Sequence, residues 1–456
     1  MLSVLDYFDI KLGLYDICLA IIYFGVLYII AFYYKRVRIA KNPEHKYFIL
    51  GLTAKVIGGF TFALLTIYYW KGGDSMGYYA TSVEFSNILL NNPISGIKLL
   101  FTSTNSVENY HLVQSYFSAP GHEYIKGDEV FFLVKITAIL NLIGLYSYGT
   151  TTILFASISF IGIWAAYSNF CKIYPNYSKH LMISFFMIPS IVFWGSGVLK
   201  DTVTMSCMGW LIYSFSNIFI FKRKIFVSVV IILVASYFIL LLKPYILYVL
   251  LPSLLIWGQT NLKNLIKGSF IRIILIPIIV LSISLGTIIV LQKISSEAGR
   301  YDIQTLQHTL EGFQSWHGYL ATTQDQSGYT LGEMEFTPVG YLKIAPAGFN
   351  VTFFRPYLWE IRNVPTLIGA VESLLLFFFV LYLLITLRGK FFKIIFKNKD
   401  IFFMMIFSVI FGIIVGISSY NFGALSRYKM PAQLLFVTAL FLIYNIAKDE
   451  RKANSN

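Results

Sequence analysis

The chain has 456 residues, of which 57% are apolar and only 13% are charged. Since roughly 25% of the residues of a soluble globular protein are charged, this composition excludes an ordinary soluble domain and indicates an integral membrane protein. The formal net charge of +14 does not indicate a nucleic acid among the partners, because the basic residues gather in short segments between apolar runs.

Long apolar runs recur along the chain and predict helices that cross a membrane. Ile225–Leu242, Ile273–Leu291 and Leu367–Leu387 are each long enough to span a hydrocarbon core of roughly 30 Å. The alternating segments of about ten residues that typify outer-membrane barrels are absent from the sequence. We therefore expect a single integral membrane domain over residues 1–456, an all-α, polytopic bundle of about 10–12 spans with large extracytoplasmic loops.

Clusters of basic residues predict the orientation of the spans. One cluster follows the first apolar run, another follows the run that ends at Leu387, and another closes the chain. Their members are Lys35, Arg36, Arg38, Lys41 and Lys46, then Arg388, Lys390, Lys393, Lys397 and Lys399, then Lys448, Arg451 and Lys452. Because basic residues gather in short cytoplasmic segments, all of these clusters are predicted to lie inside.

Residues 71–128 are then predicted to form a first external loop. Orientations counted from the two ends of the chain conflict in this region, so that either Asn87–Phe101 crosses the membrane or Val130–Tyr146 lies in the interface without crossing. The Asn-Asn-Pro sequence inside the first of these segments disfavours a span there. We therefore expect helices in the membrane interface, over Glu84–Thr102 and Val130–Tyr146.

Residues 293–365 are predicted to form a large external loop before the last spans. This stretch is polar and rich in aromatic residues. Connections of such length without secondary structure are uncommon in compact domains and are usually functional or disordered. The many aromatic side chains favour an ordered loop.

The cysteines and histidines form no metal or redox motif. Cys18, Cys171 and Cys207 lie in or beside apolar runs without paired spacing, and the six histidines are scattered. We expect the cysteines to be small core residues, and we predict no metal ligands.

A set of polar residues near the predicted outer ends of the spans makes up the candidate site. Its members are Asp74, Tyr78, Lys200, Asp201 and Lys243 in the N-terminal half, and Arg355, Glu360, Arg362, Asn421 and Arg427 in the C-terminal half. Cations outside run against the usual charge bias of membrane proteins. Since arginine binds phosphate through two hydrogen bonds and lysine binds it as a point charge, a lipid-linked phosphate at the outer leaflet would explain them.

Asp74 is the most informative of these residues. It lies in Lys71-Gly-Gly-Asp-Ser-Met-Gly-Tyr-Tyr79, just beyond the outer end of a predicted span. Glycine on both sides lets the backbone approach a substrate closely. A carboxylate in this position indicates chemistry on a molecule that approaches along the lipid.

The N-terminal candidates also have purely structural interpretations. Asp74 would cap a helix that starts near Ser75, because aspartate is a preferred N-cap residue. Lys200 and Asp201 would form a surface ion pair that contributes little to stability. Lys243, at the end of a span, would extend its amine to the membrane surface.

The C-terminal candidates have such interpretations too. Glu360 would pair with Arg355 or Arg362 inside the loop. Arg427 and Lys429 would anchor the head of the last span in the interface.

Several of these stretches resemble known membrane enzymes. The stretch Pro189-Ser-Ile-Val-Phe-Trp-Gly-Ser-Gly-Val-Leu-Lys-Asp201 between two spans, the acidic residue in the first external loop and the large loop before the last spans resemble the multispan GT-C glycosyltransferases. The stretches Phe354-Arg-Pro-Tyr-Leu-Trp-Glu360 and Asn421-Phe-Gly-Ala-Leu-Ser-Arg-Tyr428 are similar to those of bacterial surface-polysaccharide membrane proteins, including O-antigen polymerases.

The resemblance implies a transferase of the bacterial inner (cytoplasmic) membrane with an extracytoplasmic active site. Its partners would be a polyprenyl-phosphate-linked sugar donor, a glycan or lipid acceptor and the surrounding membrane lipids. Asp74 would be the general base. The phosphate leaving group would be stabilised by Lys243, Arg355 and Arg427.

The same resemblance gives the remaining candidates roles around the substrate. Asp201, with Lys200, would orient the acceptor or a second carboxylate. The chain has Gly-Gly-Asp-Ser where GT-C enzymes have paired acidic residues. The sequence therefore names no cofactor and leaves a divalent metal open. The alternatives are an O-antigen or exopolysaccharide polymerase, and a transporter or flippase for lipid-linked saccharides.

Overall fold

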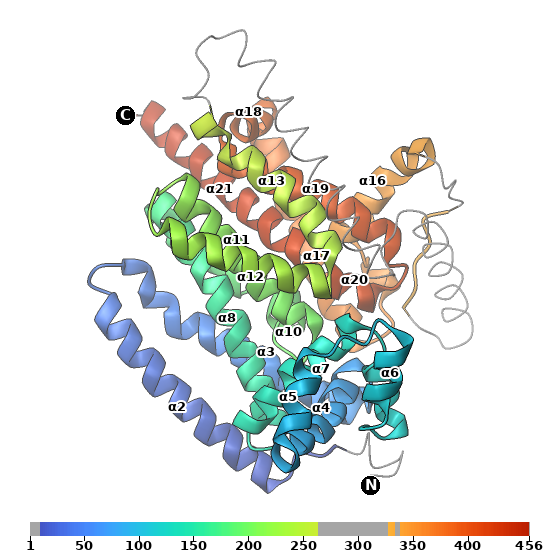
Figure 1. Cartoon of the computed structure of the whole chain (residues 1–456). Coiled ribbons are helices and arrows are strands. Elements are labelled where there is room, and N and C mark those ends of the chain that lie inside the picture. The colour runs from blue at the N-terminus through green and yellow to red at the C-terminus, as the bar shows by residue number, and fades with distance from the viewer. Residues whose placement is uncertain (1–9, 263–326, 333–337, 456) are drawn as a thin grey trace. The chain divides into compact units, whose positions relative to one another are not determined.

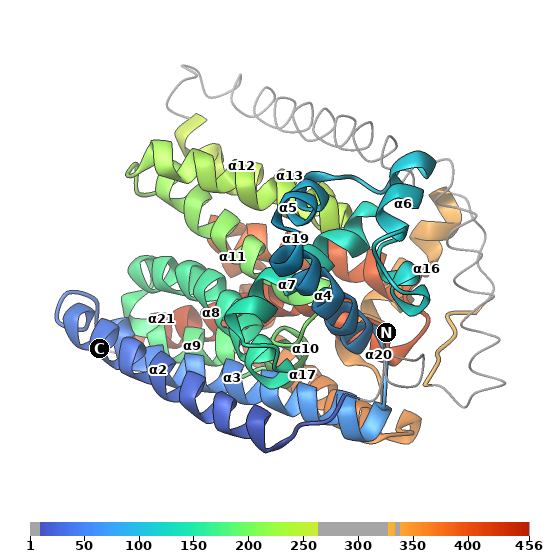
Figure 2. The same cartoon turned by 60° about the horizontal axis from the view of Figure 1, so that its bottom comes forward.

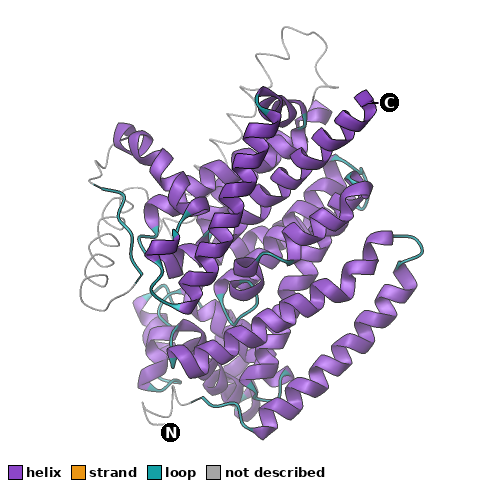
Figure 3. Ribbon diagram, turned by 180° about the vertical axis from the view of Figure 1, so that it is seen from behind, coloured by secondary structure: helices purple, strands orange, loops and turns teal. Residues whose placement is uncertain are grey.

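The computed structural model describes residues 10–262, 327–332 and 338–455 (Figure 1). The apolar run Ile273–Leu291 and most of the predicted loop 293–365 lie outside these ranges. Within these ranges every regular element is a helix (Figure 3). The described residues also form one isolated antiparallel β-bridge, between Gly328 and Asn421. The all-α class expected from the sequence is therefore confirmed.

The helices fit a polytopic membrane protein. In the described ranges, seven helical segments are long and apolar enough to cross a membrane. They are α2 (Leu14–Arg38), the continuous segment Pro43–Trp70, α8 (Tyr148–Ile173), α12 (Ile225–Leu242), α17 (Val364–Leu387), α19 (Lys399–Ser418) and α21 (Met430–Ser455). Helices thus occupy the described apolar runs that the sequence marked as spans.

The chain folds as two compact units. Within the described ranges, the first unit comprises residues 10–168, 192–210 and 237–243, and the second comprises residues 169–191, 211–236, 244–262, 327–332 and 338–455. The helices that contribute residues to both are α8, α10 (Pro189–Trp194), α11 (Lys200–Phe219) and α12. Each unit has its own buried core.

In the first unit, α2 packs against α3 (Phe48–Leu64) (Figure 1). Few side chains of α2 are buried within the unit, which suits a helix that faces lipid. Cys18 on α2 is exposed, so the expectation that it is a core residue is wrong. Cys171 and Cys207 are buried, as expected.

The predicted first external loop contains helices that pack on one another. α4 (Asp74–Asn91) lies against α7 (Asp128–Ile143) (Figure 2). Ser86 Oγ on α4 donates a 3.1 Å hydrogen bond to the carbonyl oxygen of Ala138 on α7. None of the described helices between residues 74 and 143 is among the candidate spans.

The boundaries of these helices differ from the prediction. α4 begins at Asp74 rather than at Glu84, and it ends before Pro93, which starts α5 (Pro93–Phe101). Proline is tolerated at the first position of a helix but not in its interior, so the helix predicted across it is divided. The helix predicted over Val130–Tyr146 corresponds to α7. The short elements between them are α6 (Val107–Gln114) and η3 (Ala119–Tyr124).

Small residues let α3 approach the chain around Trp194 closely. A Cβ atom on Gly58 would lie 2.2 Å from the carbonyl oxygen of Val192. The Nζ atom of Lys55, which is fully buried, donates a 2.9 Å hydrogen bond to the carbonyl oxygen of Gly195. Because positions 55 and 58 share one face of the helix, that face of α3 fixes the segment 192–195.

Gly58→Ala is expected to lower the thermal midpoint of unfolding of the purified protein by several degrees. The added methyl group meets a backbone oxygen, which cannot move aside, and overpacking of this kind destabilises by roughly 1–3 kcal/mol. The matched control is Gly25→Ala in α2, where a Cβ atom meets nothing within 4 Å. Equal midpoints for the two variants would contradict this account of the contact.

In the second unit, α16 (Pro338–Phe354) packs against α19. A Cβ atom on Gly416 would lie 2.1 Å from the carbonyl oxygen of Gly348, so the two backbones touch at a pair of glycines. Small residues at a crossing are typical of helix pairs in membranes. α19 also contacts α13 (Pro244–Leu262) and α21. Part of the predicted loop 293–365 is therefore a helix that packs against a candidate span.

Shorter elements complete the second unit. They are η4 (Pro175–Tyr177), α9 (Ser178–Phe186), η5 (Leu358–Glu360), α18 (Gly389–Lys397) and α20 (Phe422–Tyr428). Asp400 at the start of α19 accepts hydrogen bonds from the Tyr174 hydroxyl (2.6 Å) and from Trp257 Nε1 (2.6 Å). This carboxylate ties the beginning of α19 to α13 and to the chain that follows α8.

Candidate functional site

The backbone around Asp74 makes a sharp transition between two helices. The π-helical turn η2 (Leu65–Trp70) ends α3, and Lys71 has the left-handed φ of 52°. Gly73 has a φ of 98°, a conformation that glycine adopts without strain, and it is the N-cap residue of α4. Asp74 thus lies in the first turn of α4, where the helix dipole stabilises a negative charge, and its side chain is exposed. The alternative that Asp74 caps a helix from Ser75 is wrong, because Gly73 is the cap.

Tyr124 covers the helix turn that begins with Asp74. A Cβ atom on Gly77 would lie 1.8 Å from Cζ of Tyr124, so the ring rests directly on this glycine. Tyr78 is buried against the same ring, with centroids 5.5 Å apart. Burial and then the negative charge of Asp74 raise the pKa of Tyr124 to about 12. The Tyr124 hydroxyl is therefore a protonated hydrogen-bond donor near Asp74 at neutral pH.

The stretch that ends at Asp201 lies beside the Asp74 loop. Trp70, four residues before Asp74, stacks on Trp194 with ring centroids 5.5 Å apart and an interplanar angle of 18°. After Trp194 the chain turns through Gly197, whose missing side chain leaves room for the ring of Phe62. The structure thus brings together two motifs that are far apart in the sequence.

Asp201 and Lys243 form a buried ion pair. Lys243 Nζ lies 2.5 Å from Asp201 Oδ1, and the side chains are only 8% and 3% exposed. Neither residue has the environment that its structural interpretation required, since Asp201 is not at the surface and the Lys243 amine does not reach out of the protein. Lys200, which precedes Asp201, is half-exposed. The pair joins the start of α11 to the end of α12 inside the first unit.

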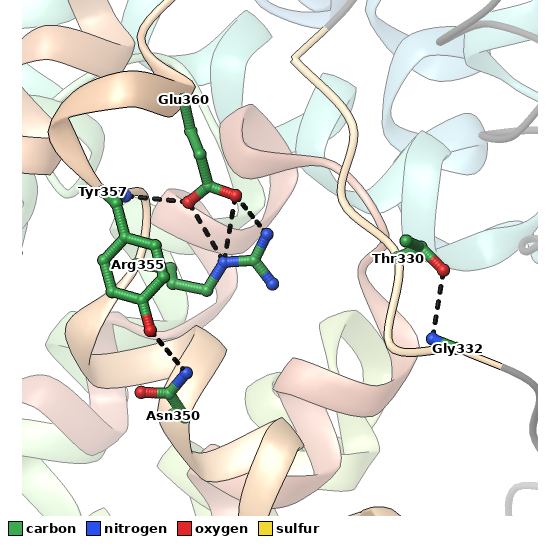
Figure 4. A network of polar contacts seen from close by, with 6 residues as sticks. All are labelled: Thr330, Gly332, Asn350, Arg355, Tyr357 and Glu360. Atoms are coloured by element: carbon green, nitrogen blue, oxygen red, sulfur yellow. Dashed lines mark hydrogen bonds and ion pairs between the residues drawn. The ribbon is translucent and has the colours of Figure 1, made fainter.

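In the second unit, Arg355 and Glu360 face each other at close range (Figure 4). Arg355 Nε lies 3.1 Å and 3.0 Å from the two carboxylate oxygens of Glu360, and one terminal nitrogen also contacts Glu360 Oε1. The backbone N–H of Tyr357 donates a 2.8 Å hydrogen bond to the same carboxylate. The interpretation that Glu360 pairs with Arg355 is confirmed. The ion pair uses Nε–H and one terminal N–H of Arg355, two of the five N–H donors of a guanidinium.

Aromatic rings surround the Arg355 guanidinium. Its Cζ atom lies 5.6 Å from the ring centroid of Tyr329, 5.6 Å from that of Tyr357 and 5.5 Å from that of Phe422. The backbone N–H of Phe422 donates a 2.9 Å hydrogen bond to the carbonyl oxygen of Ser327. Residues 327–329 thereby connect the stretch that begins at Phe354 to the stretch that begins at Asn421.

The other C-terminal candidates occupy different environments. The Asn421 side chain caps α20, since its Oδ1 atom accepts hydrogen bonds from the backbone N–H groups of Gly423 (2.8 Å) and Ala424 (3.2 Å). Arg427 is half-buried in the last turn of α20, and Arg362 is exposed. Arg362 is thus the exposed cation of this group, whereas Arg355 and Arg427 are both half-buried.

The sequence did not single out a buried polar network in the second unit. Glu372 on α17 accepts hydrogen bonds from the Ser190 backbone N–H (2.8 Å) and hydroxyl (2.9 Å) and from the Gln433 amide. The Lys429 amine is buried with no hydrogen-bond partner among the described residues. Burial lowers the pKa of this amine, and the negative charge of Glu372 offsets part of that decrease. A charged residue inside an apolar run, such as Glu372 or Lys55, is the feature of the sequence from which buried ionisable side chains could have been predicted.

Comparison of the chain with protein-family models, with curated proteins and with solved structures finds no match. Among the residues that the structure describes, no three His, Cys, Asp or Glu side chains are grouped to hold a metal ion. The function therefore has to be inferred from the polar groups of each unit.

Proposed function

We propose that this protein is a membrane glycosyltransferase that takes a sugar from a polyprenyl-phosphate donor in the assembly of a cell-surface glycan. The observation that supports this most is the exposed Asp74 carboxylate in the first turn of α4, directly after a candidate span. The stacked Trp70 and Trp194 lie beside it and connect it to the stretch that ends at Asp201. We place the reaction on the outer face of a bacterial cytoplasmic membrane.

In the proposed reaction, Asp74 acts as a general base. It accepts the proton of the acceptor hydroxyl as the oxygen attacks the anomeric carbon, and the bond electrons leave with the lipid phosphate. The Tyr124 hydroxyl, which stays protonated, would donate a hydrogen bond to substrate oxygens near Asp74. Lys243 is engaged by Asp201, so its proposed contribution is to position the start of α11.

Arg355 and Arg427 in the second unit are proposed to bind a substrate phosphate. Arg355 is held by Glu360 through Nε and one terminal nitrogen, which fixes its orientation. Arg427 in the last turn of α20 is half-buried, as Arg355 is. Arginine can offer phosphate two parallel hydrogen bonds, which lysine cannot reproduce.

The decisive test is transfer by the purified protein from a polyprenyl-phosphate-linked sugar to a glycan or lipid acceptor. The glycan of a deletion strain distinguishes the possible reactions. Loss of one sugar indicates a transferase, whereas chains that stop at one repeat indicate the alternative, a polysaccharide polymerase. An unchanged glycan together with no transfer in vitro would refute both.

A second candidate function, transport of lipid-linked saccharides, is favoured by a different observation. Lys55 and Glu372 are buried ionisable residues inside candidate spans, and such residues often mark substrate or proton pathways. Movement of a fluorescent lipid-linked saccharide across vesicles that contain the protein would test this. Transport that is lost in Glu372→Gln, in a protein without transferase activity, would favour a transporter.

Arg427→Ala is expected to reduce sugar transfer at least tenfold while leaving the thermal midpoint unchanged. A hydrogen bond to a charged group contributes roughly 1.5–3 kcal/mol, and loss of one such bond accounts for this factor. Arg427→Lys should recover only part of the activity, because the bidentate geometry is lost. The matched control is Lys397→Ala, which removes an exposed cation of the same unit on the predicted cytoplasmic side. Full activity of Arg427→Ala would exclude a phosphate contact at this residue.

A further inference from the structure

A pocket lies between the C-terminal part of α17 and the C-terminal part of α21, where basic residues gather. Its volume is about 390 Å³, and both helices are candidate membrane spans. Besides apolar side chains, its lining consists of Tyr382, Thr386, Tyr444, Lys448, Arg451 and Lys452. The pocket is thus built from cations and hydrogen-bond donors at one end of two spans.

No carboxylate lines this pocket among the described residues. The acidic residues of the same turns of α21 are held elsewhere. Asp449 accepts a 2.8 Å hydrogen bond from the Tyr177 hydroxyl, and Glu450 forms a 2.7 Å ion pair with Lys390. The positive charge of the lining is therefore not neutralised by an acidic residue of the lining itself.

The guanidinium of Arg451 is oriented by the helix that faces it. Its Nη2 atom donates a 3.0 Å hydrogen bond to the carbonyl oxygen of Thr386 on α17. Lys448 lies 5.9 Å from the ring centroid of Tyr444, a residue that also lines the pocket. These contacts hold two of the cations at the wall of the pocket.

The flank of α17 beside the pocket is suited to acyl chains. Tyr382, which lines the pocket, is 50% exposed, and Leu381 and Ile385 on the same turns are exposed apolar residues. In a membrane this face of a span contacts lipid, so a ligand of the pocket can have apolar chains that lie along α17. A free anion would leave that surface unused.

We propose that this pocket binds the phosphate headgroup of an anionic phospholipid, with its acyl chains against α17. Basic pockets between spans on the cytoplasmic side are suited to such headgroups. Arg451 offers a planar pair of donors, Lys448 and Lys452 offer point charges, and the tyrosine hydroxyls can donate hydrogen bonds to phosphate oxygens. This site is independent of the proposed glycosyltransferase reaction.

The test measures lipid-dependent stabilisation of the purified full-length protein in a neutral detergent. The thermal midpoint is followed during titration with short-chain phosphatidylglycerol, with phosphatidylcholine of the same chain length and with inorganic phosphate, because a ligand that binds the folded state raises the midpoint. The pocket variant is Lys448→Gln, Arg451→Gln, Lys452→Gln. The control variant is Arg36→Gln, Arg38→Gln, Lys41→Gln, which removes the same charge from exposed positions around the end of α2.

Phosphatidylglycerol should raise the thermal midpoint of the wild type and of the control variant. The pocket variant should need roughly a hundredfold more phosphatidylglycerol for the same rise, because it has lost three cations near the anionic headgroup. Thr386→Trp, which keeps every cation but fills the pocket, should weaken binding by at least tenfold and serves if the charge variant does not fold. Equal losses in the control variant, or unchanged binding by Thr386→Trp, would overturn the proposal. Stabilisation by inorganic phosphate alone would overturn the lipid as ligand.

Discussion

Asp74→Asn is expected to lower the rate of sugar transfer by at least a hundredfold in a protein whose thermal midpoint is unchanged. A positioned general base contributes roughly 10²–10⁴-fold, and the amide of asparagine cannot accept the proton of the acceptor hydroxyl. The fold should survive because Gly73, not Asp74, caps α4, and asparagine has nearly the same size as aspartate. The measurement is transfer from a polyprenyl-phosphate donor by the purified variant.

Asp128→Asn is the matched control, because Asp128 starts α7 in the same way that Asp74 starts α4. Each aspartate directly follows a glycine N-cap with a positive φ. Asp128, however, accepts 2.6 Å hydrogen bonds from Ser103 Oγ and from the backbone N–H of Thr104. Its replacement should lower stability and leave transfer largely intact. If Asp74→Asn also lost stability but kept its rate, Asp74 would be a structural residue.

The fold class could be predicted because the length of an apolar run determines whether a helix can cross a membrane. The residues at which individual helices begin were harder to predict than the fold class. Gly73 marks the beginning of α4 through its positive φ. The capping interpretation of Asp74 placed a helix start near Ser75, within one residue of the observed start, whereas the interfacial helix was expected to begin at Glu84. A glycine before an aspartate is a local signal that applies equally to Asp128. The contact between Arg355 and Glu360 was also predictable, since these residues are five positions apart.

Contacts between distant segments could not be derived from the sequence alone. The stacking of Trp70 on Trp194 and the network of Glu372 with Ser190 depend on how the helices pack. The partner of Asp201 was partly accessible to physical reasoning. Adjacent residues of a helix do not face each other, so Lys200 was a poor candidate for its ion pair.

The pocket between α17 and α21 shows how one pattern can have two meanings. In the sequence, Lys448, Arg451 and Lys452 served only to predict the orientation of the last span. The structure adds that all of them line one pocket while the neighbouring Asp449 and Glu450 have partners elsewhere. Charge clusters predict the side of a membrane, whereas the geometry of the side chains decides whether the cluster can hold a ligand.

Breaking the buried pair of Asp201 and Lys243 should produce the largest loss of stability in the first unit. Asp201→Asn leaves a buried ammonium group without its carboxylate, and Lys243→Met leaves a buried carboxylate without its cation. Removal of one partner of a buried ion pair destabilises by about 3–5 kcal/mol, because the remaining charge stays buried and loses the attraction that offset its desolvation. Each single variant should therefore unfold at a clearly lower temperature than the wild type.

The double variant, Asp201→Asn with Lys243→Met, separates stability from function. It removes both charges and should recover most of the midpoint, since an uncharged pair has no desolvation penalty to offset. The exposed pair of Lys390 and Glu450 is the control, and Lys390→Met should shift the midpoint little. A double variant as unstable as the single variants would contradict a direct ion pair. A stable double variant with normal transfer would make the pair structural, whereas a stable but inactive one would make the charges themselves part of the reaction.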